Sequence, residues 1–111
     1  MLVSNEPSIV KRDWGYFLQF TRNENTTVKV IRIKAGRSTH LQTHKHRTEQ
    51  WFVISGRVWI VKGELSTMMM PGDSTTIEIG EKHRFEGVDD SVILEISRGL
   101  FDETDITHYD K

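Results

Sequence analysis

The chain has no stretch of twelve residues with the periodic apolar stripe of a helix, and this constrains its fold more than any other feature. Short runs rich in Val, Ile, Phe, Trp and Thr instead alternate with breaks made of Gly, Pro, Asn and Asp. This pattern indicates an all-β sandwich or barrel, with one further helical turn expected at Leu100–Asp105. The predicted strands are Tyr16–Arg22, Thr27–Lys34, Thr39–Thr43, Gln50–Ser55, Arg57–Lys62, Glu64–Met68, Ser74–Ile79, His83–Val88 and Ser91–Ser97.

Two of these runs depart from simple alternation. Gln50–Ile54 carries large apolar groups on both faces, which predicts a strand buried on both sides. In Thr27–Lys34 the apolar residues stand at positions 28, 30, 31 and 33. The slip between Val30 and Ile31 predicts a bulge, or a strand that leaves the core.

Length and composition limit the classes of protein. We expect one domain over residues 1–111, globular because 36% of the chain is apolar and 28% charged. A net charge of -1 argues against nucleic acid as a partner, and the lack of cysteine excludes thiolate metal sites. No apolar run exceeds four residues and the first ten residues contain no basic residue, so we expect no membrane association and a cytoplasmic protein.

Histidines and carboxylates gather in two short segments. In the first, His40, His44 and His46 fall within seven residues, and Gln42 can share a strand face with His44. Glu49 can join these side chains from the next strand. A second segment, from Gly72 to Gly87, contains His83. Such a cluster suits a metal site, although a polar strand or cavity wall without metal would use the same residues.

The spacings in these segments resemble the two motifs of the cupin superfamily. The first segment reads Gly36-x5-Gln42-x-His44-x4-Glu49-x6-Gly56, and the second reads Gly72-x5-Glu78-x-Gly80-x2-His83-x3-Gly87. Gln42 in place of the first His resembles the phosphomannose isomerases, above all the C-terminal domain of the type II enzyme that is bifunctional with GDP-mannose pyrophosphorylase. The resemblance covers residues 11 to 110 and includes Lys11-Arg12-Asp13-Trp14-Gly15, Gln42-Thr43-His44-Lys45-His46-Arg47-Thr48-Glu49-Gln50-Trp51 and Glu103-Thr104-Asp105-Ile106.

This resemblance implies a small antiparallel β-barrel of the jelly-roll type. It also implies a divalent metal, zinc before iron, manganese, nickel or cobalt, with the ligands Gln42, His44, Glu49 and His83. The implied activity is a metal-dependent sugar-phosphate aldose–ketose isomerase, similar to mannose-6-phosphate isomerase, in carbohydrate and polysaccharide precursor metabolism.

Catalysis of that reaction needs a proton carrier and a cation for the anionic substrate. Arg47 matches an Arg of the family motif and is the expected substrate or transition-state contact. His46 and Glu95 are the candidates to move the proton. Further substrate contacts are expected from Arg84, Lys29 and Trp14, whereas His40 and His108 are expected on the surface.

Two other functions remain open from the sequence. His44, Glu49 and His83 would also serve as the facial triad of an iron dioxygenase. The chain carries Gln50 where the family has His, and it contains neither the closing Tyr-Gly-Arg nor a nucleotidyltransferase domain. These differences favour a non-catalytic cupin that binds a sugar or nucleotide sugar. In either case we expect a small-molecule partner and, because the N-terminal strands of a small barrel are exposed, a symmetric homodimer.

Overall fold

The chain folds into eleven strands in a computed structural model that describes residues 6–109. No residue in this range is helical, so no helix there could cross a membrane. The strands are β1 (Ser8–Arg12), β2 (Gly15–Gln19), β3 (Thr26–Ile33), β4 (Gln42–Thr43), β5 (Arg47–Ser55), β6 (Val58–Lys62), β7 (Leu65–Met69), β8 (Ser74–Ile77), β9 (His83–Gly87), β10 (Ser91–Gly99) and β11 (Thr107–His108).

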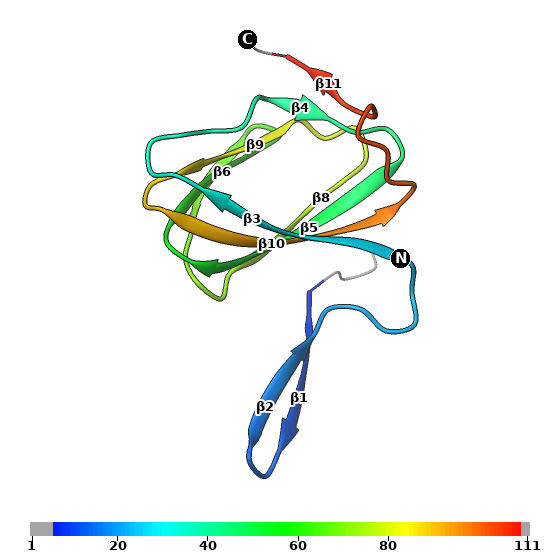
Figure 1. The fold of residues 1–111 in the computed structure, drawn as a ribbon, viewed down its shortest axis with the longest axis vertical. Coiled ribbons are helices and arrows are strands. Elements are labelled where there is room, and N and C mark those ends of the chain that lie inside the picture. Colours follow the sequence, from blue (N-terminus) through cyan, green and yellow to red (C-terminus); the bar gives the residue numbers. More distant parts are fainter. Residues whose placement is uncertain (1–5, 110–111) are drawn as a thin grey trace.

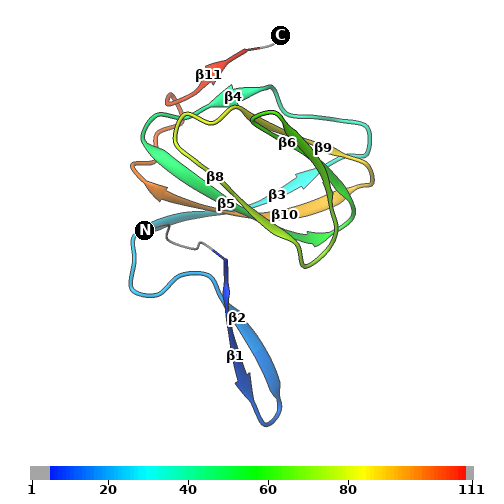
Figure 2. The same ribbon diagram turned by 180° about the vertical axis from the view of Figure 1, so that it is seen from behind.

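The strands form two facing sheets and one separate hairpin (Figures 1 and 2). One sheet has the order β3-β10-β5-β8 and the other has the order β11-β4-β9-β6-β7, and all their pairings are antiparallel. β1 and β2 pair only with each other among the described strands and project away from the sheets. The predicted all-β jelly-roll is confirmed, although the two sheets do not join into one hydrogen-bonded barrel.

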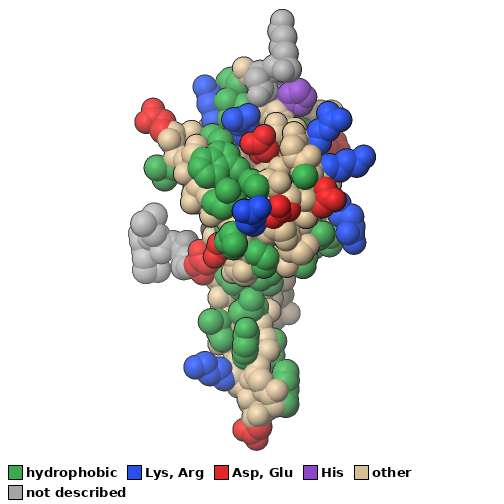
Figure 3. Space-filling view, turned by 90° about the vertical axis from the view of Figure 1, so that its left-hand side faces the viewer, with side chains coloured by type: hydrophobic (Ala, Val, Ile, Leu, Met, Phe, Trp, Pro, Cys, Tyr) green, Lys and Arg blue, Asp and Glu red, His purple; other side chains and the backbone are tan. Residues whose placement is uncertain are grey.

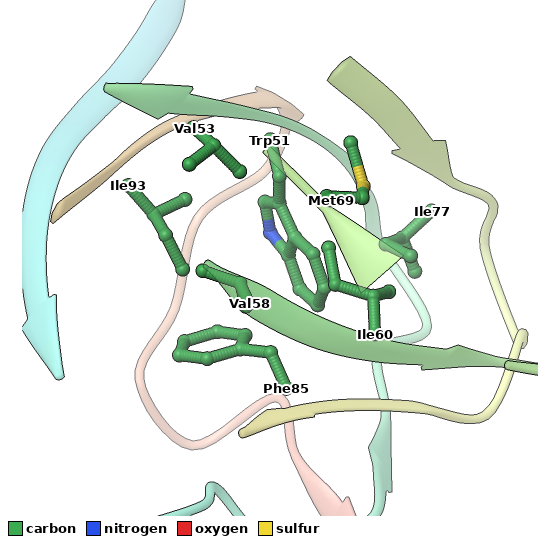
Figure 4. Packing of buried hydrophobic residues seen from close by; sticks show 8 residues of the cluster. All are labelled: Trp51, Val53, Val58, Ile60, Met69, Ile77, Phe85 and Ile93. Atoms are coloured by element: carbon green, nitrogen blue, oxygen red, sulfur yellow. The ribbon is translucent and has the colours of Figure 1, made fainter. Parts of the chain in front are cut away.

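The hydrophobic core fills the space between the sheets (Figure 4). Alternate residues of the central strands point inward, as the two-residue period of a strand requires. Trp51 packs edge-on against Phe85, with ring centroids 5.0 Å apart, and against His83 at 5.4 Å. His83 therefore packs directly against the hydrophobic core. The buried cluster consists of Trp51, Val53, Val58, Ile60, Met69, Ile77, Phe85 and Ile93.

β3 corrects the interpretation of its apolar pattern. Its pairing with β10 is regular from Thr26 to Ile33, so the predicted bulge does not occur there. The alternation changes because both faces of β3 are apolar: Ile31 packs against the core, whereas Val28 and Val30 point outward and are 55% and 60% exposed. The register shift in this sheet lies instead between β10 and β5, at Val92/Ile93.

Three other predictions are also revised. The short strands β1 and β11 were not expected, because neither has a strong apolar alternation. Leu100–Asp105 forms no helical turn. It runs as an extended segment with a turn closed by the hydrogen bond from the Asp105 N–H to the Asp102 carbonyl, at 3.0 Å. β5 is buried on both faces as far as Val53, but Ile54 is 47% exposed.

Candidate metal centre

Three buried side chains converge at one end of the core. His44 lies between β4 and β5, Glu49 lies in β5, and His83 begins β9. Their side-chain donor atoms all lie within 4.8 Å of one another. Each residue is at most 3% exposed. The structure thus brings together three of the four predicted ligands from two sequence segments, as a metal site requires.

Hydrogen bonds orient both imidazoles toward this point. His44 Nδ1 lies 2.7 Å from the Asp105 carbonyl oxygen, and His83 Nδ1 lies 2.8 Å from that of Glu81. A carbonyl oxygen only accepts, so each Nδ1 carries the proton and each Nε2 presents its lone pair to the cluster. Partners of this kind fix the tautomer of metal-binding histidines.

The donor set fits a divalent metal. His83 Nε2 is buried and has no hydrogen-bond partner among the described residues, with Glu49 Oε1 lying 3.5 Å away. Burial lowers the pKa of His83, which keeps the imidazole neutral and able to act as a ligand. Two neutral imidazoles and a carboxylate are ligands that zinc and other borderline ions accept.

Gln42 is positioned to complete this set. It lies in β4 directly opposite His83 of β9. Side chains of directly paired residues in an antiparallel ladder stand on the same face of the sheet. Gln42 is half-buried, and its place beside His83 agrees with the fourth ligand expected from the sequence.

Arg47 lies against the donor atoms. Its side chain is 3% exposed, and its Nε donates to Glu49 Oε2 at 3.2 Å. Nη2 lies 3.4 Å from His44 Nε2, and Nη1 donates to the Asp102 carbonyl at 3.1 Å. These contacts fix the guanidinium beside the donor atoms and place its positive charge against the Glu49 carboxylate.

The segment between β10 and β11, residues 100–106, forms one wall of the site and is called the wall segment below. Phe101 lies between two cations, with Arg47 Cζ 4.5 Å and Lys29 Nζ 4.2 Å from its ring centroid. Lys29 also pairs with Glu103 at 3.0 Å. The predicted substrate contacts Arg47 and Lys29 are therefore neighbours, held together by a segment more than fifty residues away in sequence from Arg47.

Asp105 ties that wall to the metal-binding loop. Its carboxylate accepts from the backbone N–H groups of Lys45 at 2.9 Å and His46 at 3.0 Å. These bonds, the Lys45 one foremost, lower the pKa of Asp105. Its own carbonyl accepts from His44. Asp105 and Phe101 were not among the site residues predicted from the sequence, although the resemblance of residues 103–106 to the family's closing motif was a signal.

Glu95 is a second buried carboxylate in the interior. It lies opposite Trp51 and Lys29 in the sheet and is 7% exposed. Burial, together with the negative charge of Glu49, raises the pKa of Glu95 from 4.5 to about 7, although Lys29 and Arg47 oppose the shift. Near neutral pH this carboxyl can therefore both accept and release a proton.

The remaining predicted residues lie away from the donor atoms. The His46 side chain is 62% exposed, with Nδ1 3.5 Å from Asp105 Oδ2, and lines a groove of about 440 Å³ beside the wall segment. Arg84 follows His83 in β9 and faces the opposite side of the sheet. Trp14 lies in the turn between β1 and β2 and is 74% exposed. Figure 1 shows this hairpin projecting away from the two sheets, so Trp14 is remote from the site of its own chain. His40 and His108 are exposed, as expected.

Comparison with known sequences points to one family. A family model described as mannose-6-phosphate isomerase C-terminal matches residues 4–111. The xanthan biosynthesis protein XanB of Xanthomonas campestris pv. campestris is 32% identical over 104 residues, covering 91% of this chain and 22% of XanB. Alginate biosynthesis protein AlgA of Pseudomonas putida is 33% identical, covering 91% and 21%, and mannose-1-phosphate guanylyltransferase RfbM of Salmonella typhimurium is 33% identical, covering 83% and 20%. The chain thus spans about a fifth of these relatives.

Solved structures with the same fold are more distant in sequence. The capsular polysaccharide assembling protein CapF of Staphylococcus aureus superposes with a TM-score of 0.70 at 19% identity, covering 95% of this chain and 34% of CapF. The rmlC epimerase of Mycobacterium tuberculosis gives 0.71 at 15% identity, covering 93% and 66%. At this identity the likeness concerns the fold alone.

Proposed function

Since the chain belongs to the mannose-6-phosphate isomerase C-terminal family of cupins, we propose that it is a metal-dependent isomerase that interconverts an aldose phosphate and a ketose phosphate. The observation that carries this proposal is the buried cluster of His44, Glu49 and His83 with the Arg47 guanidinium held against it. The cluster supplies metal donors, and the arginine supplies a cation for an anionic substrate. Mannose 6-phosphate is the first substrate to test.

The metal would be held by His44 Nε2, His83 Nε2, the Glu49 carboxylate and the Gln42 amide oxygen. Zinc is our first candidate, because it accepts a mixed imidazole and oxygen donor set. When bound, such an ion acts as a Lewis acid that polarises the sugar carbonyl. The remaining tasks, binding the anion and moving the proton, belong to residues of the chain.

Arg47 and Lys29 are the groups that we propose to bind the anionic substrate. Both cations lie over Phe101, on the side of the site formed by the wall segment. The planar fork of an arginine can donate two parallel hydrogen bonds to phosphate or enediolate oxygens. Arg47 is nearer the donor atoms, so we place it at the reacting carbons and Lys29 at the phosphate. Arg84 and Trp14 have no role in this arrangement.

The proton must leave the carbon beside the carbonyl and return to the neighbouring carbon. The electron pair of the broken C–H bond passes into an enediolate, and its return to the former carbonyl carbon forms the new C–H bond. The hydroxyl proton of the aldose passes from the C2 oxygen to the C1 oxygen, which leaves the ketose carbonyl at C2. Glu49 cannot carry this proton while it is a ligand. We propose Glu95 as the carrier, because it lies inside with a pKa of about 7, and retain His46 at the groove as the alternative.

An isomerase assay on metal-reconstituted protein tests the proposal. The purified chain is stripped with chelator, loaded with zinc, manganese, cobalt, nickel or iron(II), and assayed in both directions with mannose 6-phosphate and fructose 6-phosphate. Turnover that needs a metal and falls in Glu95→Gln, but not in His46→Gln, supports the full assignment. If turnover falls in His46→Gln but not in Glu95→Gln, proton transfer is assigned to His46.

A metal-loaded chain that binds sugar phosphate or nucleotide sugar without turnover would establish the non-catalytic cupin instead. Oxygen-dependent turnover with iron(II) would establish the dioxygenase. The cytoplasmic location, the single domain and the homodimer expected from the sequence remain predictions.

A further inference from the structure

The donor atoms of the candidate metal centre are closed off from solvent. His44, Glu49 and His83 are at most 3% exposed, and the Arg47 side chain, which lies against them, is 3% exposed. Other cations of the chain stand out into solvent, as Figure 3 shows for the face of the molecule away from the wall segment. A metal ion or a sugar phosphate therefore reaches the donor atoms only if part of the chain moves aside.

The middle of the wall segment is attached differently from its two ends. The wall segment crosses from the four-stranded sheet, which contains β10, to the five-stranded sheet, which contains β11 (Figure 1). Its ends are anchored on the loop before β5. The Leu100 N–H donates to the His46 carbonyl at 3.0 Å, and the Asp105 carboxylate accepts from the N–H groups of Lys45 and His46. Residues 101–104 lie between these anchors and belong to no strand.

Two cations hold the middle of the wall segment in place. In the described part of the chain, the hydrogen bonds, ion pairs and ring contacts that it makes with other segments all end on Arg47 or Lys29. Phe101 lies against both cations, the Asp102 carbonyl accepts from Arg47 Nη1, and Glu103 pairs with Lys29. The side chains of Lys29 and Glu103 are 36% and 72% exposed, and ion pairs this exposed contribute little to stability.

The two cations that hold this segment are also those that we propose to bind the substrate anion. A phosphate dianion forms charge-assisted hydrogen bonds with guanidinium and ammonium groups, and these bonds are stronger than a bond to a neutral carbonyl. An anion at Arg47 and Lys29 would therefore replace the Asp102 carbonyl and the Glu103 carboxylate as the partners of the two cations.

We propose that residues 101–104 are a gate over the metal centre, latched by Phe101 and Glu103, and that an anion which binds Arg47 and Lys29 opens it. The gate follows from burial and contacts, whereas its opening by substrate rests on the proposed function. A ligand shifts such an equilibrium only by binding one state better than the other. The anion binds the open state better, because only there are the two cations released from the gate.

Zinc exchange measures the gate without any turnover. Zinc-loaded protein is mixed with excess chelator and metal-free protein is mixed with zinc, so that the rates of release and uptake are followed together with the dissociation constant. Phe101→Ala should raise both rates about tenfold and Glu103→Gln about two- to fivefold, the factors expected for losing cation–π contacts and an exposed ion pair. The dissociation constant should be unchanged in both variants, because neither residue is a ligand and a gate changes uptake and release by the same factor.

Glu64→Gln and Leu65→Ala are the matched controls. Both residues are exposed where β7 begins, and both variants should exchange zinc like the parent. Thermal melts check that each variant is folded. Unchanged rates in both gate variants would overturn the gate. Faster release with an unchanged rate of uptake would also overturn it, since that result means that the segment stabilises the bound metal instead of covering it.

Sulfate tests the opening of the gate by an anion. It carries the charge of a phosphate dianion, and chloride at the same ionic strength corrects for screening. Sulfate should speed zinc release from the parent but not from Lys29→Gln, which loses the cation. Equal rates in sulfate and chloride, or an equal acceleration in Lys29→Gln, would overturn the anion-opened gate even if the protein is an isomerase. Acceleration by sulfate that depends on Lys29, in a chain without turnover, would support the gate and leave the non-catalytic cupin as the function.

Discussion

Replacing Glu95 with glutamine should make the stability of the fold less dependent on pH. The side chain is 7% exposed, and burial with the charge of Glu49 raises its pKa from 4.5 to about 7. Below pH 4.5 the carboxyl is protonated in both folded and unfolded chains and has no effect. Between pH 4.5 and 7 the unfolded chain releases the proton while the folded chain retains it, so stability falls as pH rises.

The magnitude follows from the size of the shift. One pKa unit corresponds to about 1.4 kcal/mol, so a shift from 4.5 to about 7 destabilises the fold by about 3 kcal/mol above pH 7. Glutamine is neutral at every pH and keeps nearly the same shape. The unfolding free energy of Glu95→Gln minus that of the parent should therefore increase by about 3 kcal/mol from below pH 4.5 to above pH 7.

Urea unfolding of chelator-treated protein across this pH range measures the difference. Subtracting the parent's unfolding free energy from the variant's cancels the titration of the ionisable groups that do not interact with Glu95, because that titration is common to both proteins. Glu64→Gln, on the exposed turn before β7, is the control, and its unfolding free energy should depend on pH as that of the parent does. If the unfolding free energy of Glu95→Gln also depends on pH as that of the parent does, Glu95 does not retain its proton up to pH 7 in the folded chain. That result would also remove the reason for proposing Glu95 as the proton carrier.

Three further changes test the site. His83→Ala should abolish tight metal binding measured by competition with a chelating dye, whereas His40→Ala should leave it unchanged. Asp105→Ala should weaken metal affinity about 10–100-fold in the same titration, because it frees the loop that orients His44; unchanged affinity would show that the wall segment has no such role. Arg47→Lys should lower kcat at unchanged metal content, since it keeps the charge and loses the fork, and the loss should be smaller than the roughly 10²–10³ expected for Arg47→Ala, which removes the donor; full activity in both would remove Arg47 from the mechanism.

The convergence of the candidate ligands could be predicted from strand periodicity together with the resemblance to the cupin motifs. Gln42 and His44 are two residues apart, and the two motif spacings bring Glu49 and His83 onto facing strands. The large apolar groups on both faces of Gln50–Ile54 likewise predicted a strand buried on both sides, and Trp51 in this strand is 1% exposed. Such information is local, or repeats at a fixed spacing, and can therefore be read from one sequence.

Contacts with the wall segment could not be predicted in this way. Phe101, Asp102 and Asp105 reach Arg47 and His44 through an irregular segment with no periodicity, so nothing local marks their orientation. The slip in β3 was misread for a different reason. Val30 and Ile31 simply face opposite sides, and an apolar outer face looks like a bulge when the strand is assumed to have one buried face.

The position of a bound metal tests the central claim most directly. A crystal of zinc-loaded protein, with data collected at the zinc edge, should show one anomalous peak per chain. We predict this peak about 2.0–2.2 Å from His44 Nε2, His83 Nε2, a Glu49 carboxylate oxygen and the Gln42 amide oxygen. A peak at the exposed pair His40 and His108, or fully loaded protein with no peak between His44 and His83, would contradict the account.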